Sequence, residues 1–386
     1  MLKTVDLFAG CGGLSLGFQT AGADIRAAFE FWPIAADCYE RNFNHPVFRT
    51  DLSDTKNAIK QIRPFAPELI IGGPPCQDFS HAGKRVEANR AGLTGSFAEI
   101  VSEIKPKYFV MENVDRAEKS NAYAHAREIL KKAGYGLTEL VLDASHCGVP
   151  QKRKRFFCIG VLGGPDNAVR KELLNGMTKE ATTLRAYFGE QLDFEFYYRH
   201  PRNYSRRAIF SIDEPAPTMR GMNRPVPKGY PGHPNDACPL SQDIRALTTE
   251  ERAMIQTFPA NYMWTGSKTD VEQMIGNAVP VKLAEYVAGA LFRYIGSTTD
   301  SQVAVEDFKN WLIGEKNYSE KSAKDIISRC KRAERIVGHI SIPDAYYIFT
   351  LEHQLEFQGL SAPVKSQIKR ALALNEQFAR MQNVLI

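Results

Sequence analysis

Strand-like and helix-like segments alternate through the first 160 residues of the chain. Apolar runs of four to six residues end at turn-forming residues, and longer amphipathic stretches follow several of them. We expect strands at residues 4–8, 25–30, 69–72, 108–112, 137–142 and 155–162, and helices at residues 14–21, 33–42, 96–104 and 123–132. The alternation predicts an α/β fold: a Rossmann-like, mostly parallel sheet with helices on both faces.

This rhythm is lost after about residue 163. Residues 163–243 are rich in Pro, Gly, Asn and Arg, so we expect a smaller irregular domain there. Helical patterns return at residues 248–256 and 281–294, residues 296–299 look like a linker, and the rest is expected to be helical. The predicted parts are a main domain from residues 1–162 and 262–296, a second domain from residues 163–261, and an extension from residues 297–386.

Composition limits the class of protein. A chain of 386 residues, 44% hydrophobic and 24% charged, is typical of a soluble protein of two or three domains. No apolar run approaches the ~18 residues that span a bilayer, and the strand pattern begins at once at the N-terminus. The seven cysteines are scattered, without a CxxC pair, so we expect a cytoplasmic protein without a metal site. The net charge of +5 alone says little about nucleic acid.

One cysteine has an unusual setting. Cys76 follows two glycines and two prolines, directly after the expected strand at residues 69–72. It should therefore lie on a stiff turn at the carboxyl end of a strand, where α/β proteins place reactive groups. Because a lone cysteine is more often a packed, inert residue, its interpretation depends on its neighbours.

A glycine loop follows the first expected strand. Gly10, Gly12 and Gly13 stand between that strand and a helix, with a spacing close to the dinucleotide-binding fingerprint, although Ser15 replaces its third glycine. A tight strand-to-helix turn explains the loop about as well as a nucleotide-like cofactor does.

Acidic residues stand at the next two strand ends. Glu30 ends the second strand, in a position to accept hydrogen bonds from ribose hydroxyls, and Phe31 and Trp32 could pack on an adenine ring. Asp51 ends a third, shorter strand. Each could be an ordinary surface residue, but together with the glycine loop they favour an adenosyl cofactor.

Three more segments complete the set. Residues 112–114 (Glu-Asn-Val) end a strand, residues 151–155 alternate cations along a strand, and residues 273–280 form a polar turn before a helix. Strand alternation places Arg153 and Arg155 on one face. Taken singly, these segments also suit a solvated loop acid and a basic strand edge.

In this order, the five segments resemble the C5-cytosine DNA methyltransferase family, of the bacterial restriction-modification type. The resemblance covers about residues 3–162 and 245–295, and its most specific parts are Pro75-Cys76-Gln77, Glu112-Asn113-Val114 and residues 151–155. It implies S-adenosylmethionine as cofactor and a target-recognition domain in the second, irregular part of the chain. The matching cofactor positions are Phe8, Gly10, Gly12, Leu14, Glu30, Trp32, Asp51, Leu52, Pro75, Leu93, Asn277 and Val279.

The resemblance also implies catalytic roles. Cys76 matches the nucleophile that adds to cytosine C6, Glu112 the acid that holds the ring, and Arg153 and Arg155 the cations around the base. The expected activity is methyl transfer to C5 of a flipped cytosine in a specific duplex, protecting host DNA from a cognate restriction endonuclease. The alternatives are an RNA (tRNA) cytosine-5 methyltransferase of the same chemistry and a silent DNA-binding regulator.

Basic residues cluster in the expected recognition domain. Between residues 197 and 228, seven cations outnumber two acids, and tyrosines are interleaved with them. The cations expected to contact duplex DNA are Arg199, Arg202, Arg206, Arg207, Arg220, Arg224 and Lys228. A charge run is often only a solvated face.

The C-terminal extension lies outside the resemblance. Residues 300–386 hold 12 Lys and Arg against 11 Asp and Glu, and their apolar spacing predicts a small helical core. A dimer surface and an accessory DNA clamp are lesser alternatives.

Overall fold

The computed structural model describes residues 1–75, 92–203, 205–241, 243–337 and 345–384. The chain forms two compact units, Met1–Tyr294 and Ile295–Ile386. Each unit is described by itself.

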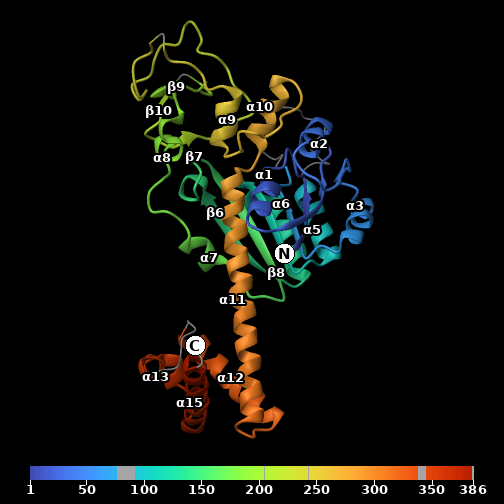
Figure 1. Ribbon diagram of the computed structural model, residues 1–386, viewed down its shortest axis with the longest axis vertical. Helices are drawn as coiled ribbons and strands as arrows, with labels where there is room; N and C mark the ends of the chain where they lie inside the picture. Colours follow the sequence, from blue (N-terminus) through green and yellow to red (C-terminus); the bar gives the residue numbers. More distant parts are fainter. Residues whose placement is uncertain (76–91, 204, 242, 338–344, 385–386) are drawn as a thin grey trace. The chain divides into compact units, whose positions relative to one another are not determined.

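The first unit is built on a seven-stranded sheet with the order β3-β2-β1-β4-β5-β8-β6 (Figure 1). All neighbouring strands are parallel except β8, which runs antiparallel to β5 and β6. The strands are β1 (Lys3–Leu7), β2 (Asp24–Phe29), β3 (Val47–Phe48), β4 (Leu69–Gly72), β5 (Tyr108–Val114), β6 (Tyr135–Asp143) and β8 (Lys154–Leu162). The Rossmann-like, mostly parallel sheet expected from the sequence is confirmed.

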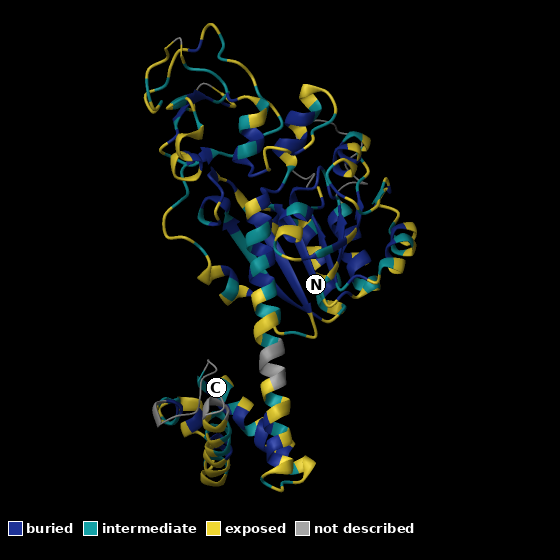
Figure 2. Cartoon of the chain, viewed as in Figure 1, coloured by how far each residue is buried: buried dark blue, intermediate teal, exposed yellow. Residues whose placement is uncertain are grey.

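Helices cover both faces of this sheet. The helices before residue 163 are α1 (Gly13–Thr20), α2 (Pro33–Glu40), α3 (Thr55–Ile62), α5 (Leu93–Ile104) and α6 (Asn121–Lys132). On one face, Phe97 of α5 packs with Leu7 and Phe109 of the strands in a fully buried core (Figure 2). On the other face, α1 lies so close to the later helix α11 that a Cβ atom on Gly17 would be 2.4 Å from that of Ala284.

The strand order determines where a site can form. From β1 the chain moves outward through β2 and β3 and then returns to pair β4 with the other side of β1, so that Leu7 faces Gly72. Parallel strands that diverge in this way leave a crevice at their carboxyl ends. The glycine loop after β1 and the proline turn after β4 therefore leave the sheet at the same edge.

Most of the elements that follow form above this edge (Figure 1). They are β7 (Gln151–Lys152), α8 (Leu184–Phe188), β9 (Phe196–Tyr198), β10 (Ile209–Ser211), β11 (Ala216–Pro217), α9 (Thr249–Ile255) and α10 (Lys268–Asn277). Helix α7 (Arg170–Asn175) instead lies beside β6. β11 pairs with β7, which directly precedes β8, and so joins this region to the main sheet. The predicted helix start at Thr248 is confirmed, since Thr248 and Glu251 form a capping box.

Two local expectations were wrong. Residues 273–277 are the last turns of α10 rather than a polar turn, and only residues 278–280 separate it from α11 (Val281–Gly314). Residues 296–299, expected as a linker, lie inside α11. Helix propensity is a weak preference, and the strong helix-forming residues on both sides of these four continue the helix through them.

The second unit is helical, as expected. Beyond α11 it contains α12 (Glu320–Val337), α13 (Ala345–Glu352), α14 (Leu355–Gln358) and α15 (Ala362–Val384). Its core joins Trp311 and Leu312 of α11 to Ile326 of α12, Leu351 of α13 and Leu372 of α15. Among the residues described in both units, no helix is long and apolar enough to cross a membrane.

Candidate active site

The loop after β1 has an unusual backbone. Phe8, Gly10 and Gly12 have φ angles of 58°, 56° and 93°, in the left-handed region that favours glycine. A Cβ atom on Gly12 would lie 2.4 Å from the ring of Phe43, so only glycine fits there. The loop then enters α1, in which Leu14 is buried.

Glu30 holds this loop in place. One carboxylate oxygen accepts a hydrogen bond from the backbone N–H of Gly10 at 2.7 Å, and the other accepts one from the N–H of Trp32, also at 2.7 Å. Burial raises the pKa of Glu30, while its bonds to the Trp32 and Gly10 amides oppose the rise. The carboxylate keeps lone pairs for further donors.

The other expected cofactor residues lie around the same edge or close to it in sequence. Asp51 is exposed just after β3 and accepts a hydrogen bond from the Ser53 amide, whereas Leu52 is buried beside it. A Cβ atom on Gly13 would lie 2.4 Å from the carbonyl oxygen of Val279, so the segment after α10 packs on the glycine loop.

Three further residues expected to bind the cofactor differ in exposure. Asn277 is exposed at the end of α10 and accepts a hydrogen bond from Gln273, and Pro75 is exposed after β4. Leu93 is half-buried at the start of α5. Their roles in cofactor binding stay predictions.

A nearly buried ion pair at this edge joins Glu112 and Arg155. Nε of Arg155 lies 2.9 Å from Oε1 of Glu112, with only 13% and 10% of the two side chains exposed. The antiparallel register of β5 and β8, in which Val114 faces Arg155, brings them together. Burial raises the pKa of Glu112, and the charges of Arg155 and Arg153 oppose this rise.

Glu112 also lies beside the proline turn. A Cβ atom on Gly73 would be 3.2 Å from its Oε2, and the Asn113 side chain donates a hydrogen bond to the Pro74 carbonyl at 3.0 Å. The acid thus lies next to the segment that leads to Cys76. Cys76 itself lies outside the described residues, and its role stays a prediction.

Arg153 has partners that the sequence did not suggest. Its fully buried guanidinium donates to the carbonyl oxygens of Met219, Gly276 and Ala278 at 2.9–3.0 Å. Within the chain it therefore ties the start of β8 to the segments after β11 and α10.

Two glutamines missed by the sequence analysis as site residues extend this contact. Gln151 accepts a hydrogen bond from the Met219 amide at 2.8 Å and donates one to Gln256 at 2.7 Å. Gln256 in turn donates to the Ala278 carbonyl. Both side chains are fully buried. No local signal distinguished Gln256 from the polar face of an ordinary helix.

The seven cations expected to contact DNA fall into two groups. Arg199 donates to the Thr218 carbonyl at 2.6 Å, Arg220 to the His200 carbonyl, and Arg207 pairs with Glu214 above the Phe210 ring. The other four, which are exposed and have no ion pair within the described ranges, are Arg202, Arg206, Arg224 and Lys228. The first group has partners within the chain, and the role of all seven cations in DNA binding stays a prediction.

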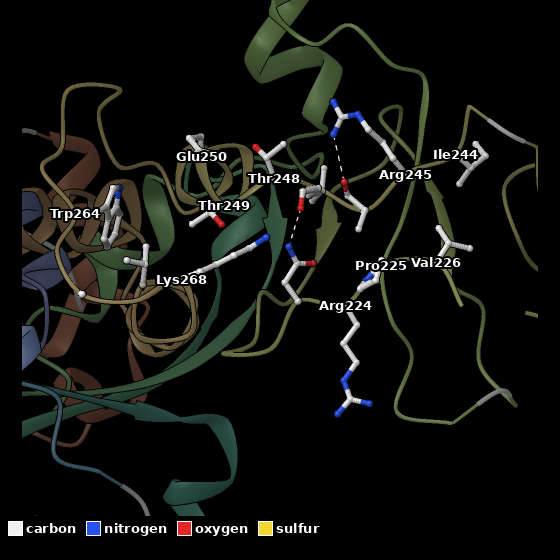
Figure 3. A pocket seen from close by; sticks show the side chains of 15 residues that line it. Arg224, Pro225, Val226, Ile244, Arg245, Thr248, Thr249, Glu250, Trp264 and Lys268 are labelled. Carbon is white, nitrogen blue, oxygen red and sulfur yellow. Dashed lines mark hydrogen bonds between the residues drawn. The ribbon is translucent and has the colours of Figure 1, made fainter. Parts of the chain in front are cut away.

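Arg224 of this second group lines a cavity of about 920 Å³. It is lined by residues 223–226 and 244–250, together with Trp264 and Lys268 (Figure 3). Asn223 donates to the Leu247 carbonyl at 2.8 Å across its wall, and the Arg224 side chain points away from Trp264. Its lining comes from residues 223–271 and includes no residue of the glycine loop.

Comparison with known proteins identifies the family of the chain. The sequence profile of the C-5 cytosine-specific DNA methylases matches residues 2–293. The chain belongs to this family. The match ends at the boundary between the two compact units.

Similar proteins support the same assignment. The chain is 53% identical to the type II methyltransferase M.HindV of Haemophilus influenzae over 297 residues, 76% of this chain and 97% of that protein. It is 51% identical to M.HgiDI of Herpetosiphon aurantiacus over 305 residues, 79% and 98% of the two chains. The expected activity class, a DNA cytosine-5 methyltransferase, is confirmed.

Solved structures agree on the fold. The S. pombe Dnmt2 methyltransferase superposes with a TM-score of 0.57 over 76% of this chain and 99% of that chain, at 20% identity. A mutant DNMT2 of Spodoptera frugiperda gives the same TM-score, over 76% and 100% of the chains. At this identity the likeness concerns the fold alone.

Proposed function

We propose that this methyltransferase uses S-adenosylmethionine to methylate C5 of a cytosine flipped out of duplex DNA, with Cys76 as nucleophile. The observation that carries the proposal is the buried Glu112–Arg155 pair beside the Gly73–Pro75 turn. It lies at the sheet edge from which the glycine loop also leaves.

The residues around the glycine loop fit an adenosyl group. A Cβ atom on Gly10 would meet nothing within 4 Å, so the loop borders open space, and Glu30 offers acceptors beside it. Phe8, Gly10, Gly12, Leu14, Pro75, Leu93, Asn277 and Val279 would line the pocket, Glu30 would bind the ribose, and Trp32, Asp51 and Leu52 would contact the adenine. When bound, S-adenosylmethionine supplies an electrophilic methyl group.

Glu112 and Arg155 would hold the base. A protonated Glu112 can donate to cytosine N3 and accept from the exocyclic amine, and burial, which raises its pKa, makes that protonation easier than for an exposed glutamate. Arg155 lies within reach of Glu112 and would bind O2 of the same ring. Arg153 donates hydrogen bonds to three carbonyl groups. It would hold the backbone two residues before Arg155 in place rather than contact the base.

Cys76 would make the covalent bond. Its thiolate would add to C6 and break the C5–C6 double bond, whose electrons form a C4–C5 double bond as N3 takes a proton from Glu112, so that C5 becomes a nucleophilic enamine carbon. C5 would then bond to the methyl group as the methyl–sulfur bond of the donor breaks and S-adenosylhomocysteine is left. The C5 proton would pass to a base, for which water is a candidate, and the electron pair of that C–H bond would re-form the C5–C6 double bond as the thiolate leaves and N3 returns its proton to Glu112.

Access to a stacked base requires flipping, at a cost of a few kcal/mol. The exposed Arg202, Arg206, Arg224 and Lys228 would hold the phosphates of the duplex. We infer a bacterial cytoplasmic modification enzyme that protects DNA from a cognate restriction endonuclease. The similarity to type II methyltransferases over nearly their whole length supports this role.

Bisulfite sequencing tests the proposal. DNA from cells expressing the wild-type chain should contain protected cytosines in one short sequence context, and DNA from cells expressing Cys76→Ser should contain none. Unprotected cytosines in both samples, with folded wild-type protein present, would overturn the proposed function.

A further inference from the structure

Helix α12 of the second unit has two chemically distinct faces. Its buried residues, which all belong to the core of the unit, are Ala323, Ile326, Ile327, Cys330, Ala333 and Ile336. Their spacing of three and four residues places them along one side of the helix, which packs against α15 (Figure 1). The opposite side of α12 therefore faces away from this core.

That outer side carries a row of cations. We call the α12 basic stripe the set Lys321, Lys324, Lys331, Arg332 and Arg335. At about 100° per residue, these five fall within one half of the helix surface and extend along about 21 Å of its axis. Arg332 is half-buried and the other four are exposed. Glu320 and Asp325 are the acids that share this side.

The stripe differs from other cations of the same unit in its pairing. Lys309, Lys369 and Arg380 each form an ion pair with a glutamate. In the stripe, Lys324 pairs with Glu320. Over the described part of the unit, the other four stripe cations have no carboxylate within ion-pair distance. Positive charge is thus gathered on one face although residues 300–386 are nearly balanced, with 12 cations and 11 acids.

We propose that the α12 basic stripe binds the phosphate backbone of duplex DNA without reading its sequence. The proposal rests on the proposed function, in which the substrate is duplex DNA. A duplex presents one negative charge per ~1.7 Å of its axis, so a straight row of ~21 Å meets several phosphates. The outer side of α12 carries no large apolar residue to insert into a bilayer, which favours DNA over a membrane surface.

The test is the salt dependence of binding by the full-length chain. The probe is a fluorescent 30-base-pair duplex of alternating A and T, which contains no target cytosine. The stripe variant carries Lys331→Gln, Arg332→Gln and Arg335→Gln. The control variant carries Lys309→Gln, Lys369→Gln and Arg380→Gln, which removes the same charge from the same unit. Circular dichroism verifies that both retain the helical content of the wild type.

Each phosphate contact contributes about 0.9 to the slope of log affinity against log salt concentration. For the stripe variant, the magnitude of this slope should be smaller than that of the wild type by up to about 3. Its affinity for the duplex near 0.1 M salt should be lower on the order of tenfold or more. The slope and affinity of the control variant should stay close to those of the wild type. A single Arg335→Gln substitution should lower the magnitude of the slope by about a third as much as the stripe variant does.

Equal slopes for wild type and stripe variant, or equal losses in both variants, would overturn the proposal. So would a stripe variant that loses binding only to an acidic polypeptide such as polyglutamate. Methyl transfer to cytosine-containing DNA by the wild type is measured separately. If methyl transfer is absent while the slopes of wild type and stripe variant still differ, the proposed function is wrong. The proposal that the stripe binds DNA is then still supported.

Discussion

Arg155 and Glu112 form a nearly buried ion pair, with 2.9 Å between Nε and Oε1, across the paired strands β5 and β8. Removing two charges from water is costly. We therefore expect this pair to act on a bound group.

Glu112→Gln should remove the proton donor while keeping the shape of the side chain. We expect kcat for methyl transfer to fall by about 10²–10⁴-fold, the usual contribution of general acid catalysis. Affinity for S-adenosylmethionine, measured by calorimetry, should be unchanged. The control is Glu118→Gln, which alters an exposed acid shortly after the same strand. Turnover of Glu112→Gln within a few-fold of wild type would contradict the assigned role.

Substitutions of Arg153 and Arg155 should differ in their effects, the first mainly on stability and the second mainly on catalysis. Arg153→Ala removes a donor from three carbonyl groups, of which Ala278 keeps Gln256 as a second donor, and we expect it to lower the free energy of unfolding by about 3 kcal/mol or more. Arg155→Ala should cost less stability but abolish most single-turnover methylation. Urea unfolding and rapid-quench assays measure the two effects. A stable but inactive Arg153→Ala would instead place Arg153 on the base.

Asp6 makes the stability of the first unit depend on pH. Burial raises its pKa to about 8, although Ser15 donates a hydrogen bond to it at 2.7 Å. Because the folded chain binds this proton and the unfolded chain does not between about pH 4 and 8, stability should fall as pH rises. The slope from this group is at most about 1.4 kcal/mol per pH unit.

Asp6→Asn removes that titration. The free energy of unfolding of the wild type minus that of the variant should therefore decrease between pH 5 and pH 8. Urea titrations at four pH values measure this difference, in which the other titrating groups cancel. A difference that is constant over the range would show that Asp6 does not carry a raised pKa.

A second buried ion pair joins α9 to α10. Arg252 and Glu272 are 4% and 5% exposed, and Glu272 also accepts hydrogen bonds from Thr249 and Asn223. Glu272→Ala leaves a buried guanidinium without its partner, at an expected cost of about 3–5 kcal/mol in urea unfolding. Asp24→Ala, which breaks the exposed pair with Arg26, should cost under about 1 kcal/mol. Equal effects would mean that burial does not decide the strength of these pairs.

Local patterns predicted the sheet and its functional edge because each strand and its terminal turn are encoded within a few residues. The run at residues 69–72 and the glycines after Leu7 are such signals, and the structure joins them at one edge. Glu30 was predicted in the same way, from its place at a strand end.

Contacts between distant segments could not be predicted. The partners of Arg153 lie 66, 123 and 125 residues further along the chain, and nothing local distinguishes a buried arginine from one that faces a base. The intrachain partners of Arg199, Arg207 and Arg220 were not predicted for the same reason, since cation clustering does not reveal which guanidinium groups have partners within the chain. The residues at 296–299 show how flanking sequence overrides weak local propensity.

The central claim is that Cys76 attacks C6 of cytosine. The most direct measurement uses a long duplex in which every cytosine is replaced by 5-fluorocytosine, which cannot lose its C5 substituent as a proton. With S-adenosylmethionine present, the wild-type chain should form a covalent complex whose peptide map places the bond on Cys76, and Cys76→Ser should form none. No cofactor-dependent adduct, or an adduct on another residue, would contradict the mechanism.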